Sequence, residues 1–124
     1  MRYAMFMIPA VYGTAAADDV PSAEMIDKMM AYNAELAEAG VLEAVDGLHP
    51  PGSGVRLHFE QSGAQTRDVP AVGAVGGLWV IKVDSYASAH AWAQRCPALP
   101  GDIVELRRIE ELDDLPADDE GSKP

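Results

Sequence analysis

A histidine with possible carboxylate partners lies in the stretch "GLHPPGSGVRLHF", residues 47–59. An imidazole accepts or donates a proton near neutral pH, so His49 beside a carboxylate would form a general base. Asp46 and Asp68 are the carboxylates that the sequence offers for this role. Alternate residues of a strand share a face, so Asp46 can orient His49 only if the chain bends at Gly47. His49, Asp46 and Asp68 are therefore the candidate catalytic residues.

A structural interpretation of the same histidines competes with the catalytic one. His49 precedes Pro50 and can be a turn-flanking side chain that bonds only locally. His58 alternates with apolar residues, which favours an exposed side chain. The same region offers four side chains that can bind a metal ion: His49, His58, Asp46 and Asp68. No short ligand spacing such as His-x-x-x-His or Cys-x-x-Cys occurs, however. We therefore expect neither a metal nor another cofactor.

Four further residues are candidates for lining a ligand cleft: Tyr32, Asn33, Arg56 and Trp79. Such a cleft would lie between helix and sheet or between subunits. The alternative is that Tyr32 and Trp79 are ordinary core residues. Cys96 is expected to be a small buried apolar residue, because a reactive thiol needs an exposed, electropositive setting.

Composition limits the class of protein. The 124 residues are enough for one domain, and a net charge of -11 argues against nucleic acid and anionic membranes as partners. Much of the negative charge falls in residues 110–124, so we expect a single domain over 1–112 and an acidic, disordered tail over 113–124. The single cysteine, and the lack of a signal-like or membrane-spanning stretch, predict a cytoplasmic protein.

The elements that must position the candidate residues follow from apolar periodicity and turn signals. The order is β-α-β, a β-hairpin, then β-α-β, which predicts an α+β fold, a ferredoxin-like sandwich. The expected elements are a strand at 3–8, a helix at 23–39 capped by Ser22, a strand at 41–48, a hairpin of 55–59 with 66–69, a strand at 78–83, a helix capped by Asp84 or Ser85 and a strand at 102–109.

The first helix should bury a single apolar stripe against the sheet. The residues expected in this stripe are Met25, Ile26, Met29, Met30, Asn33, Leu36 and Ala37. Two helices cover only one face of the sheet. A second copy of the chain is the economical cover for the other face, so we expect a homodimer.

Six segments of the sequence resemble the YCII-related proteins of the DGPF type. They are, in order, "MRYAMFM", "PSAEMIDKMMAYNAELAEAGVL", "DGLHPPGSGVRLHF", "GGLWVIKVDS" with "AWAQRCP", and "IVELRRIEE". The resemblance covers residues 1–112. The segment that names the family departs from its pattern: an Asp-Gly-Pro-Phe run usually followed by Ala-Glu-Thr-Lys-Glu is replaced by the shorter "DVPAVGAVGG", residues 68–77.

The resemblance implies a ferredoxin-like fold that pairs into a dimeric α+β barrel. Most members of the DGPF type have no established reaction, and some lie beside sigma-factor genes, which implies a regulatory association. More distant relatives include small-molecule enzymes that use a His–Asp pair with the histidine on the first helix. Helix 23–39 has no histidine here, and Met29 lies near that place.

Two functions remain open from the sequence. The favoured one is a small dimeric domain without catalysis, a ligand-binding or regulatory accessory protein. The alternative is a small-molecule enzyme with lyase- or isomerase-like acid–base chemistry by a histidine–carboxylate pair. The expected partners are a second copy of the chain and a small-molecule ligand.

Overall fold

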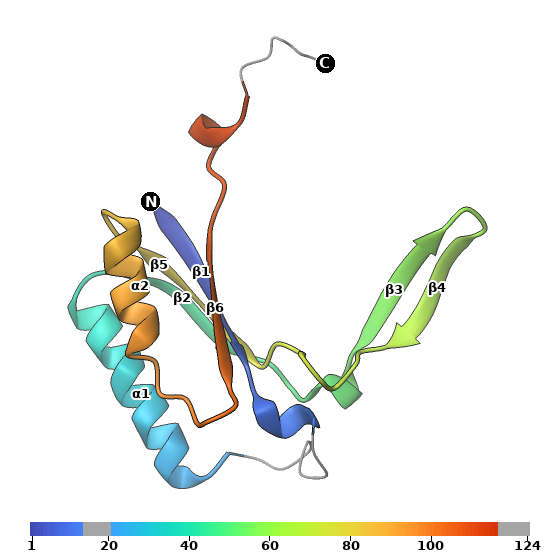
Figure 1. Cartoon of the computed structure of the whole chain (residues 1–124), viewed down its shortest axis with the longest axis horizontal. Coiled ribbons are helices and arrows are strands. Elements are labelled where there is room, and N and C mark those ends of the chain that lie inside the picture. The colour runs from blue at the N-terminus through green and yellow to red at the C-terminus, as the bar shows by residue number, and fades with distance from the viewer. Residues whose placement is uncertain (14–20, 117–124) are drawn as a thin grey trace.

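The computed structural model describes residues 1–13 and 21–116, which form two helices, six strands and three short 3₁₀ turns (Figure 1). The strands and helices are β1 (Arg2–Ile8), α1 (Ala23–Glu38), β2 (Leu42–Gly47), β3 (Val55–Glu60), β4 (Gly63–Asp68), β5 (Gly77–Lys82), α2 (Tyr86–Gln94) and β6 (Ile103–Arg108). The 3₁₀ turns are Ala10–Gly13, Pro51–Ser53 and Leu112–Asp114.

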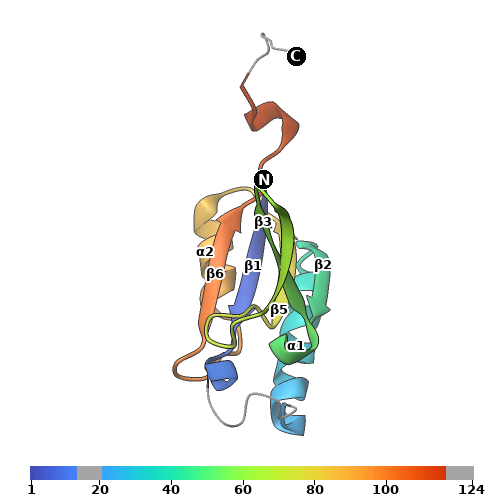
Figure 2. The same ribbon diagram turned by 90° about the vertical axis from the view of Figure 1, so that its right-hand side faces the viewer.

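Four strands form an antiparallel sheet in the order β2-β5-β1-β6 (Figure 2). Within the described residues β3 and β4 pair only with each other. Both helices lie on the same side of the four-stranded sheet (Figure 1). This is the ferredoxin-like α+β arrangement that the sequence predicted. In the described residues β2 and β6 are the edges of the sheet, so the single chain closes no barrel.

Helix α1 begins and ends where its capping residues predict. The Ser22 side chain accepts a hydrogen bond from the Met25 amide at 3.2 Å. At the other end Gly40 has a φ of 76°, and the amides of Gly40 and Val41 donate to carbonyls of the last turn at 3.0 and 3.1 Å. This pair of bonds is a Schellman motif, which glycine permits because it has no Cβ.

The core lies between the sheet and the two helices. Met5, Leu36, Ile81 and Ala89 are fully buried there. The stripe that α1 buries is narrower than the sequence predicted. Ile26, Met30 and Ala37 are exposed. The side chains of α1 that are buried or half-buried are those of Met25, Met29, Tyr32, Asn33 and Leu36. The positions that follow Met25, Met29 and Leu36 are turned by about 100° and point away from the sheet.

The opposite face of the sheet carries apolar residues that nothing in the described chain fully covers. Phe6 lies directly opposite Leu78, and Ala4 lies opposite Val80. All four side chains are half-buried. The alternate residues of β1, which face the helices, are buried: Tyr3, Met5 and Met7. Within this chain the helices therefore bury one face of β1, and the other face stays half-buried.

The β3–β4 hairpin stands apart from the body, on the side of the sheet opposite the helices (Figures 1 and 2). Every residue of both strands is exposed. Val55, Leu57 and Phe59 alternate with polar residues, which is the pattern of a half-buried strand, but they are 63%, 55% and 82% exposed. The reason is that, in residues 1–13 and 21–116, the hairpin pairs with no other strand and packs on no helix. A two-stranded hairpin without a packed face is marginally stable in water.

After β6 ends, the chain passes beside the start of β1. Arg2 donates two hydrogen bonds to Glu111, and this contact lowers the pKa of the Glu111 carboxyl. Arg108 pairs with Asp114 at 3.2 Å. The acidic tail expected over 113–124 thus begins within the 3₁₀ turn Leu112–Asp114, and residues 117–124 lie outside the described residues. Its disorder, and the domain boundary at residue 112, stay predictions.

None of the helices in the described residues is both long enough and apolar enough to cross a membrane.

Candidate ligand site at the base of the hairpin

A hollow of about 410 Å³ lies where the hairpin joins the body. Ligand pockets in proteins typically measure about 300–1,000 Å³, so this hollow is large enough for a small molecule. Its walls come from the segment before β3, from β3 itself and from the loop between β4 and β5. The lining residues are Leu48, His49, Pro50, Pro51, Ser53, Gly54, Arg56, Val69, Gly73, Ala74 and Val75.

The connection from β2 to β3 brings His49 and Arg56 to this hollow. Strand β2 ends at Gly47, and the Leu48 amide donates to the Gly76 carbonyl at 2.9 Å. The two prolines that follow favour a tight turn, which the Ser53 amide closes with a 3.0 Å bond to the Pro50 carbonyl. Strand β3 then starts and places Arg56 on the same hollow as His49.

The loop from β4 to β5 forms the facing wall, and it lies in residues 68–77, where the sequence departs from the pattern of the proteins that it resembles. Ala74 is buried, and Val69 and Val75 are half-buried. The loop passes close to the start of the chain at Gly76, where a Cβ would lie only 2.8 Å from the Pro9 side chain. Only glycine fits there, which explains the glycine-rich approach to β5.

The candidate catalytic residues do not all meet at this hollow. His49 lines it and is exposed, whereas Asp46 and Asp68 are exposed residues outside its lining. Within the described residues His49 makes no hydrogen bond to either carboxylate. The hairpin register sets Asp68 opposite Val55, one position away from Arg56 and so on the other face of the ribbon. The catalytic role of the three residues stays a prediction.

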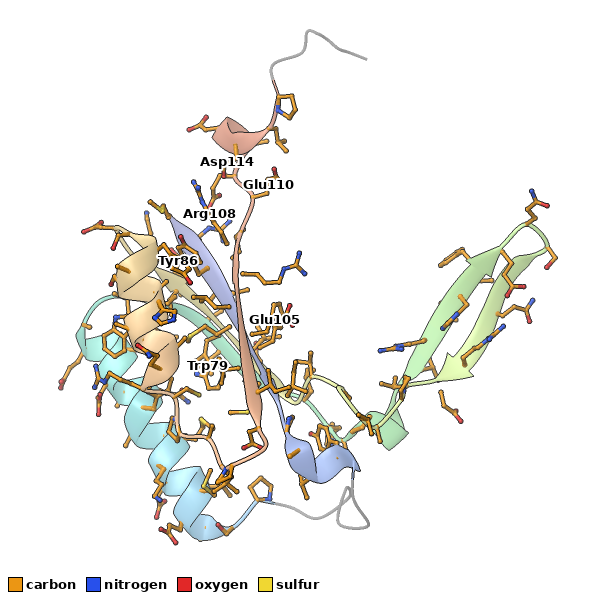
Figure 3. All side chains as sticks on the ribbon, in the orientation of Figure 1. Trp79, Tyr86, Glu105, Arg108, Glu110 and Asp114 are labelled. Carbon is orange, nitrogen blue, oxygen red and sulfur yellow. The ribbon has the colours of Figure 1, made fainter. Side chains whose placement is uncertain are left out.

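The four predicted cleft residues separate into two groups. Arg56 lines the hollow, while Tyr32, Asn33 and Trp79 meet between sheet and helices, where Figure 3 shows Trp79. The Trp79 indole donates to the Asn33 amide oxygen at 2.7 Å, and the Tyr32 hydroxyl donates to the Trp92 carbonyl at 2.6 Å. Burial raises the pKa of Tyr32, which keeps the phenol neutral. In this chain the second group holds α1 and α2 to the sheet.

Cys96 is the buried residue that the sequence predicted, at 8% exposure. Burial raises the pKa of the thiol to about 11. At pH 8 about one molecule in a thousand would then carry the reactive thiolate. We therefore expect a disulfide reagent such as dithionitrobenzoate to label the native protein far more slowly than the urea-unfolded chain. Equal rates in the two states would contradict the buried position.

No metal site forms in residues 1–13 and 21–116, where no three His, Cys, Asp or Glu side chains gather closely enough to hold an ion. Sequence reasoning missed the apolar walls of the hollow, Leu48, Val69 and Val75. Valine and leucine carry no chemical signature, so only the folded loop shows that they face His49 and Arg56.

These features define a small ferredoxin-like α+β domain with a candidate site beside a projecting hairpin. A family model described as the YCII-related domain matches residues 1–113, and the chain belongs to that family. This confirms the resemblance that the sequence segments indicated. A search of curated proteins gives no match.

Proposed function

We propose that this protein is a small-molecule-binding accessory protein that acts as a homodimer without catalysis. The observation that carries the proposal is the hollow, which His49 lines and where none of the carboxylates in the described residues bonds to it. A histidine general base needs a partner that orients it and a substrate atom within reach. A site with donors and apolar walls but no acid–base pair is suited to binding. The cytoplasm is the proposed location, since the one cysteine is a free thiol.

The uncovered sheet face supports the homodimer. Phe6, Leu78 and Val80 form its centre, and their side chains are only half-buried in the isolated chain. Figure 3 shows Glu105 on the same side, away from the helices. An apolar centre bordered by charged residues is typical of an interface. Face-to-face pairing of two such sheets would build the barrel that the family resemblance implies.

The ligand site is tested by filling it. We expect Val69→Trp, in the wall of the hollow, to abolish the binding of small fragments detected by NMR on the native protein. Val72→Trp is the matched control, because Val72 lies in the same loop, is 78% exposed and does not line the hollow. Fragments that bind equally to both variants, or that never perturb the hollow, would contradict the proposal.

The proposed absence of catalysis is tested by a separate measurement. Each fragment that binds is left with the protein, and its NMR spectrum is followed for a day. We expect an unchanged ligand. Conversion that stops in His49→Gln would favour the alternative function, acid–base chemistry by a histidine.

A further inference from the structure

Within the part of this strongly acidic chain that the structure describes, Arg56 is an unpaired cation. The protein has 20 Asp and Glu against 9 Lys and Arg. Eight of those nine basic residues lie in the described ranges, and six of the eight have a carboxylate within 4.0 Å. Arg56 and Lys82 are the other two. An arginine left without a carboxylate despite such an excess of acids is available for an anion from outside.

The register of the hairpin leaves the charge of Arg56 uncompensated. Arg56 lies directly opposite Arg67, and like charges placed opposite each other destabilise a strand pair. Glu60, on the same face, pairs with Arg67 at 3.2 Å. The one carboxylate on this face of the described hairpin is thus paired with Arg67. A bound anion at Arg56 would supply the missing negative charge.

The walls around Arg56 define the rest of the ligand. Among the described residues no acidic side chain lines the hollow, and besides Arg56 the lining includes His49, whose ring nitrogens can donate or accept a hydrogen bond. Most of the remaining lining is apolar: Leu48, Pro50, Pro51, Val69, Ala74 and Val75. A guanidinium binds a carboxylate through two parallel hydrogen bonds. One cation among apolar walls suits a singly charged ligand with an apolar body better than a doubly charged phosphate.

We propose that the hollow binds a small organic carboxylate, whose anionic end pairs with Arg56 and whose apolar body lies against the valine and proline walls. This inference rests on the proposed function and names its ligand class. The net charge of the chain repels anions at long range. The apolar contacts therefore carry part of the affinity, and the site should reject an anion that lacks an apolar body.

The test compares three probes on the intact protein by NMR titration at neutral pH. Benzoate has the proposed charge and shape, benzamide is its neutral analogue, and inorganic phosphate is an anion without an apolar body. We expect benzoate to perturb the amides of Leu48 and Ala74 and to bind at least about tenfold more tightly than benzamide. Phosphate should bind more weakly than benzoate.

Two variants separate Arg56 from a general effect of charge. Arg56→Gln should weaken benzoate at least about tenfold and leave benzamide unchanged. Lys28→Gln removes the same charge from α1, on the other side of the sheet, and should change benzoate affinity less than about twofold because the charge is distant and screened. Both positions are exposed, and circular dichroism verifies that both variants fold.

Each other outcome has a distinct meaning. Equal binding of benzoate and benzamide at the hollow would overturn the carboxylate while leaving a ligand site in place. Equal losses in both variants, or phosphate binding more tightly than benzoate, would also overturn it. If no fragment of any charge binds in the hollow, that result would instead refute the proposed function on which the inference rests.

Discussion

Replacing Phe6 with glutamate should dissociate the proposed dimer into monomers. Phe6 lies at the centre of the uncovered sheet face, directly opposite Leu78. A carboxylate placed there would be buried without a partner in each half of the interface, which costs several kcal/mol. We expect the dimer dissociation constant to rise at least about a hundredfold, because each 1.4 kcal/mol is about tenfold.

Light scattering on a sizing column measures this change directly. The wild-type mass should be twice the 13.2 kDa of one chain, and the Phe6→Glu variant should elute with the mass of one chain. Met30→Glu is the matched control, since Met30 is 63% exposed on α1, which covers the other side of the sheet. A wild-type monomer at micromolar concentration, or a dimer that persists in Phe6→Glu, would be inconsistent with a dimer formed through this face.

Shortening Leu36 to alanine should cause the largest loss of folding stability. The Leu36 side chain has 0% exposure and belongs to the core between α1 and the sheet. Removing a fully buried leucine side chain forfeits its transfer free energy and leaves a cavity, together about 3–5 kcal/mol. That loss is a large part of the stability of a domain of this size, which is about 5–15 kcal/mol.

Urea unfolding followed by circular dichroism gives the free energy of unfolding for this comparison. The wild type and the variant are compared at one protein concentration, because the stability of a dimer depends on concentration. Leu112→Ala is the control, since Leu112 is 86% exposed, and it should change stability by less than about 0.5 kcal/mol. A loss below about 1 kcal/mol in Leu36→Ala would contradict the packing of α1 described above.

Capping residues made the helices predictable, while apolar identity alone did not define their buried faces. Ser22 and Gly40 mark the ends of α1 in the sequence and occupy the capping positions in the structure. Ile26 and Met30 are as apolar as Met25 and Met29, yet they are exposed. The sequence does not distinguish the two sets because apolar residues occupy more of the helix than the sheet can cover.

The hairpin shows where local pattern fails. Val55, Leu57 and Phe59 alternate with polar residues as a half-buried strand does, but burial depends on a contact far from the hairpin in sequence. The same limit applies to the candidate site. His49 and Arg56 could be named from residue type, whereas their common hollow depends on the turn at Pro51–Ser53 and on a loop about twenty residues further along the chain.

The bare β3–β4 ribbon has a consequence for the chain during synthesis, before it meets a partner. Two strands with unpaired edges and an apolar side can add to the same ribbon of another nascent chain, which leads to aggregates. The charged side chains of Arg56, Glu60 and Arg67 along its other side oppose such stacking. Replacing these three residues with neutral residues of high β-propensity would lower the yield of soluble protein on expression, even where the free energy of unfolding is the same as that of the wild type.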